Sequence, residues 1–259
     1  MEIVSSTQNP AVKLARSLAL KKHRTETGLF LAEGRLVMDM ARRAGWKPHT
    51  LFLGPETKAK DLIDWASEHK TRCLRVSESV MAALSPQGNP LDAIGIFQQH
   101  MAPPPRQPEK PEVWIALEDI RDPGNLGTII RTTDAAGASG VILVGQSCDP
   151  YSRESVRASM GSLFQVPLVR MDLQAFAALA SKWPGDVIAT RMQAERDYRS
   201  AYRQPALIVM GSEGAGLSSA TAGLCTLEVR IPMAGRAQSL NLAIAAALLL
   251  YEVRRPALI

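Results

Sequence analysis

A segment with five prolines, residues 101–112, constrains the fold of this chain more than any other feature. Its sequence is Met-Ala-Pro-Pro-Pro-Arg-Gln-Pro-Glu-Lys-Pro-Glu. Proline lacks the backbone N–H that a helix or a central strand needs, and neighbouring prolines favour an extended, semi-rigid chain. The segment therefore predicts a linker between an N-terminal unit, residues 1–100, and a C-terminal unit, residues 113–259.

The C-terminal unit alternates short apolar runs with helical patterns. The predicted strands are residues 113–117, 141–144, 166–169, 187–190, 206–210 and 227–231. A turn at residues 122–125 leads into a predicted helix that ends at about residue 136, and the other predicted helices are residues 152–159, 173–183 and 242–252. Such alternation indicates an α/β domain with a parallel sheet that is covered on both faces. The last helix is apolar all round, which predicts that it is buried.

The N-terminal unit has the pattern of a small α/β sandwich. Its predicted helices are residues 13–24, 36–44, 59–69 and 78–84, and its predicted strands are residues 50–53, 73–76 and 93–98. The unit carries 14 Lys and Arg against 10 Asp and Glu, so it holds +4 of the formal net charge of +5. A basic face of this kind suits an RNA backbone, although a solvated helix face is the simpler alternative. The candidate RNA-binding residues are Lys13, Arg16, Lys21, Lys22 and Arg24.

Composition excludes several classes of protein. No apolar run reaches the roughly 18 to 20 residues that span a bilayer, and the first ten residues lack the pattern of a signal peptide. The three cysteines, Cys73, Cys148 and Cys225, lie far apart without the spacing of a metal site. We therefore expect a cytoplasmic protein with reduced thiols, no membrane segment and no bound metal.

Polar residues or glycines directly follow two of the predicted strands. The first segment, Asp122-Pro123-Gly124-Asn125, comes after residues 113–117 and leads into a helix that contains Arg131. Ligands of open α/β sheets collect at the carboxyl ends of strands, so Asn125 and Arg131 are candidate site residues. A plain turn with a surface arginine remains the alternative.

The second segment, Gly211-Ser212-Glu213-Gly214-Ala215-Gly216-Leu217, follows the strand at 206–210. Its glycines let a ligand approach the backbone, and they leave N–H groups free to bind it. The order G-x-x-G-x-G matches neither the dinucleotide fingerprint nor a phosphate loop. The carboxylate of Glu213 would repel phosphate and suits a neutral or cationic ligand. A plain glycine turn is the alternative.

The third segment, residues 231–241, reads Ile-Pro-Met-Ala-Gly-Arg-Ala-Gln-Ser-Leu-Asn and leads into the last helix. Gln238, Ser239 and Asn241 could accept hydrogen bonds from the free N–H groups at the start of that helix. Polar residues at the edge of a core also suit a ligand site. The segment alone leaves both interpretations open.

Together, the three segments resemble the motifs of the SpoU (TrmH-type) RNA ribose 2′-O-methyltransferases, which belong to the SPOUT class. Asn125 and Arg131 match the first motif, residues 211–217 the second, and residues 231–241 the third. Residues 5–13 and 28–34 resemble the start of the substrate-binding domain in many members, and that domain has an L30e-like fold. The resemblance implies a C-terminal α/β domain with a trefoil knot, preceded by an L30e-like RNA substrate-binding domain.

The resemblance also implies a cofactor and a set of site residues. Family members use S-adenosylmethionine and form homodimers in which both knotted domains build each site. The implied catalytic residues are Arg131, Asn125, Glu213, Ser239 and Asn241. The implied cofactor-binding residues are Gly211, Glu213, Gly214, Ile231, Met233, Ser239 and Leu240. Arg131 is either the base that accepts the hydroxyl proton or an anchor for an RNA phosphate, since a guanidinium normally stays protonated.

We therefore predict an S-adenosylmethionine-dependent RNA 2′-O-ribose methyltransferase. Ribosomal RNA is favoured over transfer RNA because the N-terminal unit resembles that of rRNA-modifying members. The alternatives are a tRNA 2′-O-methyltransferase, a non-catalytic RNA-binding protein of the same fold, and a nucleotide-dependent dehydrogenase that uses the glycine loop. The last is disfavoured by the glycine order.

Overall fold

The computed structural model describes residues 3–85 and 92–258. The contacts divide the described chain into two units. The first unit holds the described residues up to His100 together with Asp149–Gln165. The second holds Met101–Cys148 and the described residues from Val166 onward. Residues 101–112 contain no helix or strand, as their prolines predict.

The second unit is built on a six-stranded sheet with the order β11-β9-β10-β6-β7-β8. Its strands are β6 (Val113–Glu118), β7 (Gly140–Val144), β8 (Leu168–Met171), β9 (Val187–Thr190), β10 (Ala206–Met210) and β11 (Leu227–Val229). Every pair of neighbouring strands is parallel, so the predicted parallel sheet is confirmed. The predicted strand at 166–169 is displaced to β8, because Pro167 has no N–H for a ladder bond.

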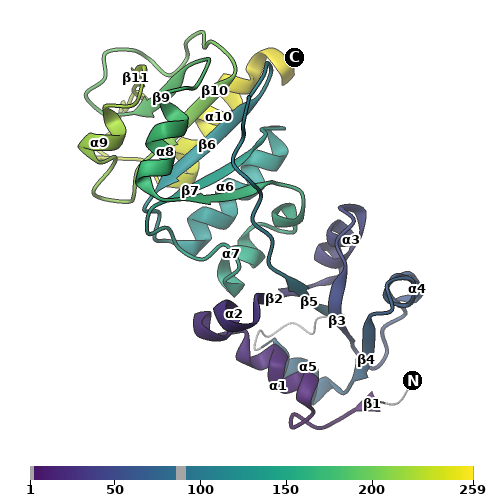
Figure 1. Ribbon diagram of the computed structural model, residues 1–259. Helices are drawn as coiled ribbons and strands as arrows, with labels where there is room; N and C mark the ends of the chain where they lie inside the picture. The colour runs from purple at the N-terminus through teal and green to yellow at the C-terminus, as the bar shows by residue number, and fades with distance from the viewer. Residues whose placement is uncertain (1–2, 86–91, 259) are drawn as a thin grey trace. The chain divides into compact units, whose positions relative to one another are not determined.

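Helices cover both faces of this sheet. They are α6 (Pro123–Ala135), α8 (Leu173–Ala180), α9 (Ser219–Ala222) and α10 (Leu242–Leu258). Figure 1 shows α8 in front of the sheet and α10, in yellow, behind it. Trp114 and Ala116 of β6 belong to the apolar cluster around Phe176 of α8, and the alternate residues Ile115 and Leu117 point to the opposite face. Burial on both faces explains why the strands are continuous apolar runs.

The last helix is not buried all round, which contradicts the prediction. Ala246, Leu249 and Leu250 are buried, but Ile244 is 52% exposed and Tyr251 is 48% exposed. The helix lies along one face of the sheet and contacts α6 on the same side, so within one chain only part of its circumference is covered. An apolar helix face therefore remains exposed in the single chain.

The first unit contains a five-stranded mixed sheet with the order β1-β4-β3-β5-β2. Its strands are β1 (Ile3–Val4), β2 (Leu29–Glu33), β3 (Pro48–Leu53), β4 (Arg72–Val76) and β5 (Ala93–Gln98). Its helices are α1 (Pro10–Ser17), α2 (Lys21–Thr27), α3 (Arg35–Arg43), α4 (Lys60–Glu68), α5 (Glu78–Leu84), α7 (Arg153–Ala158) and the 3₁₀ helix η1 (Ser162–Phe164). Strands β1 and β2 were not predicted from the sequence, whereas β5 and α5 have their predicted bounds.

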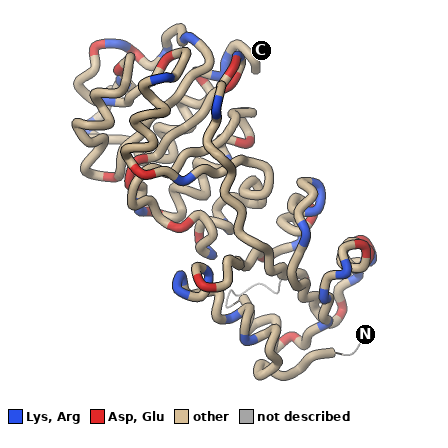
Figure 2. The backbone as a smooth tube through the Cα atoms, in the orientation of Figure 1, with Lys and Arg blue, Asp and Glu red and all other residues tan. Residues whose placement is uncertain are grey.

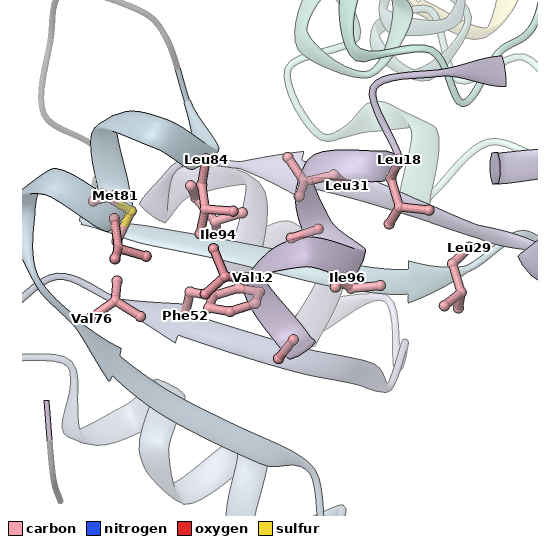
Figure 3. Packing of buried hydrophobic residues seen from close by; sticks show 13 residues of the cluster. Val12, Leu18, Leu29, Leu31, Phe52, Val76, Met81, Leu84, Ile94 and Ile96 are labelled. Carbon is pink, nitrogen blue, oxygen red and sulfur yellow. The ribbon is translucent and has the colours of Figure 1, made fainter. Parts of the chain in front are cut away.

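One apolar cluster of this unit joins α1 and α5 to the sheet (Figure 3). Val12 of α1, Leu84 of α5, and Phe52 and Ile94 of the sheet are all fully buried. Burying side chains of this size stabilises the unit by about 1.5–3 kcal/mol each. The small α/β sandwich that the sequence predicted therefore has its own core.

The predicted helix at 13–24 is two helices, α1 and α2. The break follows from Arg24, whose Nη1 donates to the carbonyl oxygens of Leu18 and Ala19 at 2.9 and 3.0 Å. Those carbonyls lie just beyond the end of α1. Because the helix does not continue there, no backbone N–H of a next helical turn is available to them. Leu20 adopts an extended conformation, with φ −92° and ψ 132°, and α2 then begins.

Residues Asp149–Gln165 belong to the first unit, although they follow the linker in the sequence. Aromatic packing accounts for this: the rings of Phe30 and Tyr151 lie 4.6 Å apart, and those of Trp46 and Phe164 lie 5.0 Å apart. Trp46 Nε1 also donates to the Phe164 carbonyl oxygen at 2.9 Å. The structure thus differs from the boundary that the sequence predicted, because the chain leaves the second unit after β7 and returns before β8.

Candidate active site

A cavity of about 660 Å³ lies in the second unit, where the carboxyl ends of β9 and β10 meet the segment before α10. The carboxyl edge of a parallel sheet is the usual place for a ligand, and this volume suits a small molecule. The cavity is lined by Thr190, Arg191, Met192, Met210, Gly211, Ser212, Glu213, Gly214, Gly216, Leu217, Ile231, Met233, Gln238, Ser239, Leu240, Asn241, Leu242 and Ala245. All seven predicted cofactor-binding residues are among them.

The glycine loop, residues 211–217, folds back on itself. Gly216 N donates to the Ser212 carbonyl oxygen at 3.0 Å. A Cβ on Gly211 would collide with the backbone of Gly216 and Leu217, so no larger residue fits there. Gly214 and Gly216 have φ of +94° and +69°, values that glycine adopts without strain. The loop therefore needs three glycines for its shape, and it presents Glu213 at the cavity.

A chain of hydrogen bonds joins the three predicted motifs. Asn125 Nδ2 donates to Glu213 Oε1 at 2.8 Å, and Asn241 Nδ2 donates to Asn125 Oδ1 at 2.9 Å. The two pairs are 88 and 116 residues apart in sequence. Each amide uses its nitrogen as donor and its oxygen as acceptor, which fixes the orientation of both side chains. The structure thus brings Asn125, Glu213 and Asn241 together.

Asn241 also caps α10. Its Oδ1 accepts hydrogen bonds from the backbone N–H groups of Ala243 and Ile244, at 2.9 and 3.3 Å. Of the three cap candidates, Gln238 and Ser239 instead line the cavity. The cap interpretation is therefore confirmed for Asn241, whose oxygen satisfies the helix end. Its nitrogen donates to Asn125, so the site interpretation is compatible with the cap and stays a prediction.

Arg131 does not reach the cavity of its own chain. It lies on the exposed face of α6 and is not among the lining residues. Asn125, six residues earlier on the same helix, donates to Glu213 of the glycine loop. The structure of one chain therefore joins every predicted catalytic residue to the cavity or its hydrogen-bond network except Arg131.

The basic residues of the first unit divide into two groups. Lys13 and Arg16 on α1 and Lys21 and Lys22 on α2 are exposed, and Figure 2 shows blue positions along both helices. Arg24 is only 4% exposed, and its Nε and Nη2 contact Asp149 Oδ2 at 2.8 and 2.7 Å. The prediction that Arg24 contacts RNA was therefore wrong, because its buried guanidinium pairs with Asp149 inside the unit.

The end of β9 contributes residues to the cavity that were not predicted from the sequence. Thr190, Arg191 and Met192 line the cavity at the end of this strand. Arg191 Nη1 lies 2.9 Å from Glu228 Oε1, so its charge is shared with a carboxylate at the same edge. The strand was predicted, and the rule that ligands collect at strand ends could have found these residues. They form no motif of their own.

The cavity combines apolar side chains, free backbone groups and one carboxylate. Met210, Leu217, Ile231, Met233 and Leu240 offer surfaces for an aromatic ring. Glu213 gives the site a negative charge suited to a cation, and the exposed backbone of the glycine loop can bind polar groups. In the described part of the chain, no group of His, Cys, Asp and Glu side chains could hold a metal ion, and no helix is long and apolar enough to cross a membrane.

Comparison with known proteins agrees with this arrangement. Residues 112–251, more than half of the chain, match the model of the SpoU rRNA Methylase family, and residues 9–95 match the MRM3-like substrate binding domain. The chain resembles the AdoMet-bound rRNA methyltransferase of Sinorhizobium meliloti, with a TM-score of 0.91, 42% identity and 98% of each chain covered.

Two curated relatives carry more specific names. The chain is 30% identical to the 23S rRNA (guanosine(2553)-2′-O)-methyltransferase RlmP of Bacillus subtilis, over 98% of this chain and 100% of the relative. It is 33% identical to the 23S rRNA (uridine(2479)-2′-O)-methyltransferase of Streptomyces viridochromogenes, over 92% of this chain and 86% of the relative. These two proteins share a reaction and differ in the nucleotide they modify.

Proposed function

The chain belongs to the SpoU rRNA Methylase family, and from this premise we propose that it methylates a ribose 2′-hydroxyl of ribosomal RNA with S-adenosylmethionine as the methyl donor. The observation that carries the proposal is the hydrogen-bond chain Glu213–Asn125–Asn241 at the cavity. It joins all three motifs of the family at one edge of the sheet. Two relatives that match more than nine tenths of the chain are named as rRNA 2′-O-methyltransferases.

The cavity fits S-adenosylmethionine in size and in chemistry. Its volume, about 660 Å³, suits a ligand of this size. Ile231, Met233 and Leu240, with the backbone of Gly211, would hold the adenine and ribose, and Glu213, Gly214 and Ser239 would hold the methionine end, since all of them line the cavity. The bound cofactor supplies a methyl group on a positively charged sulfur, and Glu213 provides the complementary charge.

The 2′-hydroxyl is a weak nucleophile near neutral pH and needs a proton acceptor. Asn125, Asn241 and Ser239 shape the part of the site that receives the ribose. Arg131 binds an RNA phosphate and orients the ribose, because a guanidinium stays protonated and pairs well with phosphate oxygens. The protonated guanidinium of Arg131 cannot accept the hydroxyl proton. The proton therefore passes to another acceptor, such as the phosphate that Arg131 holds.

A second copy of the chain supplies Arg131 to the cavity. Two observations support a homodimer: Arg131 lies outside the cavity of its own chain, and α10 leaves an apolar face exposed. That face borders a hollow of about 430 Å³ lined by Tyr198, Ile244, Ala247, Leu248, Tyr251, Glu252 and Arg255. Burying such a patch against another copy removes apolar surface from water. We also propose that the C-terminal α/β domain contains the trefoil knot that the family resemblance implies.

Light scattering after gel filtration tests the dimer. The wild type should elute at twice the mass of the chain, and Ile244→Asp combined with Tyr251→Asp should elute as a monomer without methyl transfer. A wild-type monomer that methylates RNA would refute the shared site.

The first unit binds the RNA through the exposed residues of α1 and α2, Lys13, Arg16, Lys21 and Lys22. Deletion of residues 1–100 is a poor test, because it would also uncover Tyr151 and Phe164, which pack against Phe30 and Trp46. Point substitutions of the lysines avoid this problem.

We also propose that the protein acts in the cytoplasm, in keeping with an rRNA substrate.

Mapping of 2′-O-methyl groups in a deletion strain tests the proposed substrate. One rRNA ribose should lose its methyl group, and a plasmid with the wild-type gene should restore it. Loss of a methyl group from tRNA alone would favour the tRNA alternative over rRNA.

Titration with S-adenosylmethionine tests whether the protein is an enzyme of this class, since a protein that only binds RNA should give no heat.

A further inference from the structure

Glu118, the last residue of β6, is a buried carboxylate outside the cavity lining. It is 6% exposed and accepts three hydrogen bonds. Its Oε2 accepts from the backbone N of Ser218 at 2.8 Å, and its Oε1 accepts from Ser218 Oγ and Thr221 Oγ1 at 2.7 and 2.5 Å. A buried carboxylate with fewer donors would be costly, and these bonds to a charged acceptor are strong.

The donors lie where the glycine loop ends. Ser218 directly follows residues 211–217, and it is the N-cap of α9, where its Oγ accepts from Thr221 N at 3.2 Å. At its start the loop is fixed by β10, which ends at Met210. At its end it is fixed by Glu118, 100 residues earlier in the sequence.

We propose that Glu118 is a positioning residue for S-adenosylmethionine binding, which acts by holding the end of the glycine loop. The inference rests on the proposed function for the identity of the ligand. Glu118 does not line the cavity, but it fixes Ser218, and thereby the loop that presents Gly211, Glu213 and Gly214 to the ligand. It does this from the central strand β6, which pairs directly with β10.

A carboxylate suits this task better than an amide. All three partners donate, and a carboxylate only accepts, whereas glutamine would turn an NH₂ group toward one of them. The side-chain hydroxyls of Ser218 and Thr221 can rotate to accept from that NH₂, while the backbone N–H of Ser218 cannot. Glu118→Gln should therefore keep part of the function by placing its oxygen at the N–H.

The expected effect on affinity follows from the population of the ordered loop. A ligand that binds only one loop conformation has an apparent dissociation constant that rises as this conformation becomes rarer. Loss of hydrogen bonds to a charged group raises the dissociation constant by about tenfold to a hundredfold.

Titration calorimetry of the full-length protein with S-adenosylmethionine tests the proposal. Glu118→Ala should raise the dissociation constant by about tenfold or more, and Glu118→Gln by less. The matched control is Ser147→Ala, which removes a buried hydroxyl three residues beyond β7. The Oγ of Ser147 donates to the Leu117 and Val144 carbonyl oxygens at 3.1 and 2.9 Å. This control should lose stability but bind within about twofold of the wild type. Equal affinity of Glu118→Ala and the wild type would overturn the proposal.

A double-mutant cycle with Thr221→Val separates positioning from general destabilisation. If Glu118 and Thr221 act through their shared hydrogen bond, the double variant Glu118→Gln with Thr221→Val should bind S-adenosylmethionine little worse than whichever single variant binds it less tightly. Additive losses of affinity would overturn the proposal, and this pair remains informative if Glu118→Ala does not fold.

Hydrogen exchange distinguishes this inference from the proposed function. Without ligand, the amides of residues 211–222 should exchange faster in Glu118→Gln than in the wild type, while those of Ser147→Ala should not. A wild type that binds no S-adenosylmethionine would refute the proposed function. Unchanged exchange in Glu118→Gln would refute the holding role of Glu118 even if the wild type binds the ligand tightly.

Discussion

Asn241 allows the stability of the fold and the function of the site to be separated, because its two side-chain atoms serve different partners. Oδ1 caps α10 through Ala243 N and Ile244 N, and Nδ2 donates to Asn125 Oδ1. Loss of an N-cap costs about 1 kcal/mol, and loss of a hydrogen bond between neutral side chains costs a similar amount. Asn241→Ala should therefore destabilise the second unit by about 2 kcal/mol, which lowers its melting temperature by about 4–8 °C.

Asn241→Asp should behave differently. Its carboxylate keeps both cap acceptors, and a negative charge is favourable at a helix N-terminus. It cannot donate to Asn125, and it adds a second carboxylate to a network that already contains Glu213. We expect a melting temperature within about 2 °C of the wild type and a loss of methyl transfer as large as that of Asn241→Ala.

Scanning calorimetry and transfer of a radioactive methyl group to rRNA measure the two quantities. The aspartate variant serves as the control for helix capping, since it keeps the cap acceptor and replaces the donor with a charged carboxylate oxygen. The reasoning would be refuted if Asn241→Asp were as unstable as Asn241→Ala, or if it methylated rRNA at the wild-type rate.

Three further substitutions or reactions test other parts of the account. Lys21→Ala with Lys22→Ala should weaken rRNA binding and reduce the slope of log affinity against log salt by about one to two, as measured by fluorescence anisotropy, and an unchanged slope would remove α2 from the RNA interface. Arg24→Ala should destabilise the first unit by about 3–5 kcal/mol in urea unfolding, because Asp149 then loses its buried partner; a loss below about 1 kcal/mol would contradict the buried pair. Burial raises the pKa of the Cys225 thiol to about 12, so at pH 8 its reactive thiolate is about a thousandfold rarer than at an ordinary pKa, and rapid labelling by iodoacetamide in the folded protein would contradict this.

Local patterns predicted most of the second unit. Its sheet is parallel and its strands are apolar on both faces, so the sequence carries a strong signal that does not depend on distant residues. The glycine loop was identified for the same reason, since the shape that requires Gly211, Gly214 and Gly216 is local. The cavity was then expected at the strand ends.

Features that depend on distant partners were not predictable in this way. The break between α1 and α2 follows from Arg24, whose charge is used by Asp149, 125 residues later. Residues Asp149–Gln165 join the first unit through Phe30 and Trp46, and no periodicity reports that pairing. The exposed face of α10 was predicted to be core because an apolar helix gives the same sequence pattern whether or not its own chain covers all of its faces.

The direct test of the central claim is methyl transfer by the purified protein. Unmethylated rRNA is incubated with the protein and with S-adenosylmethionine that carries a radioactive methyl group. The RNA is then digested to nucleosides, and the label in each separated nucleoside is measured. The account predicts a single labelled 2′-O-methylnucleoside with the wild type and almost none with Arg131→Ala, which should still bind the cofactor within about twofold of the wild type. Label on a base rather than a ribose, or wild-type transfer by Arg131→Ala, would contradict it.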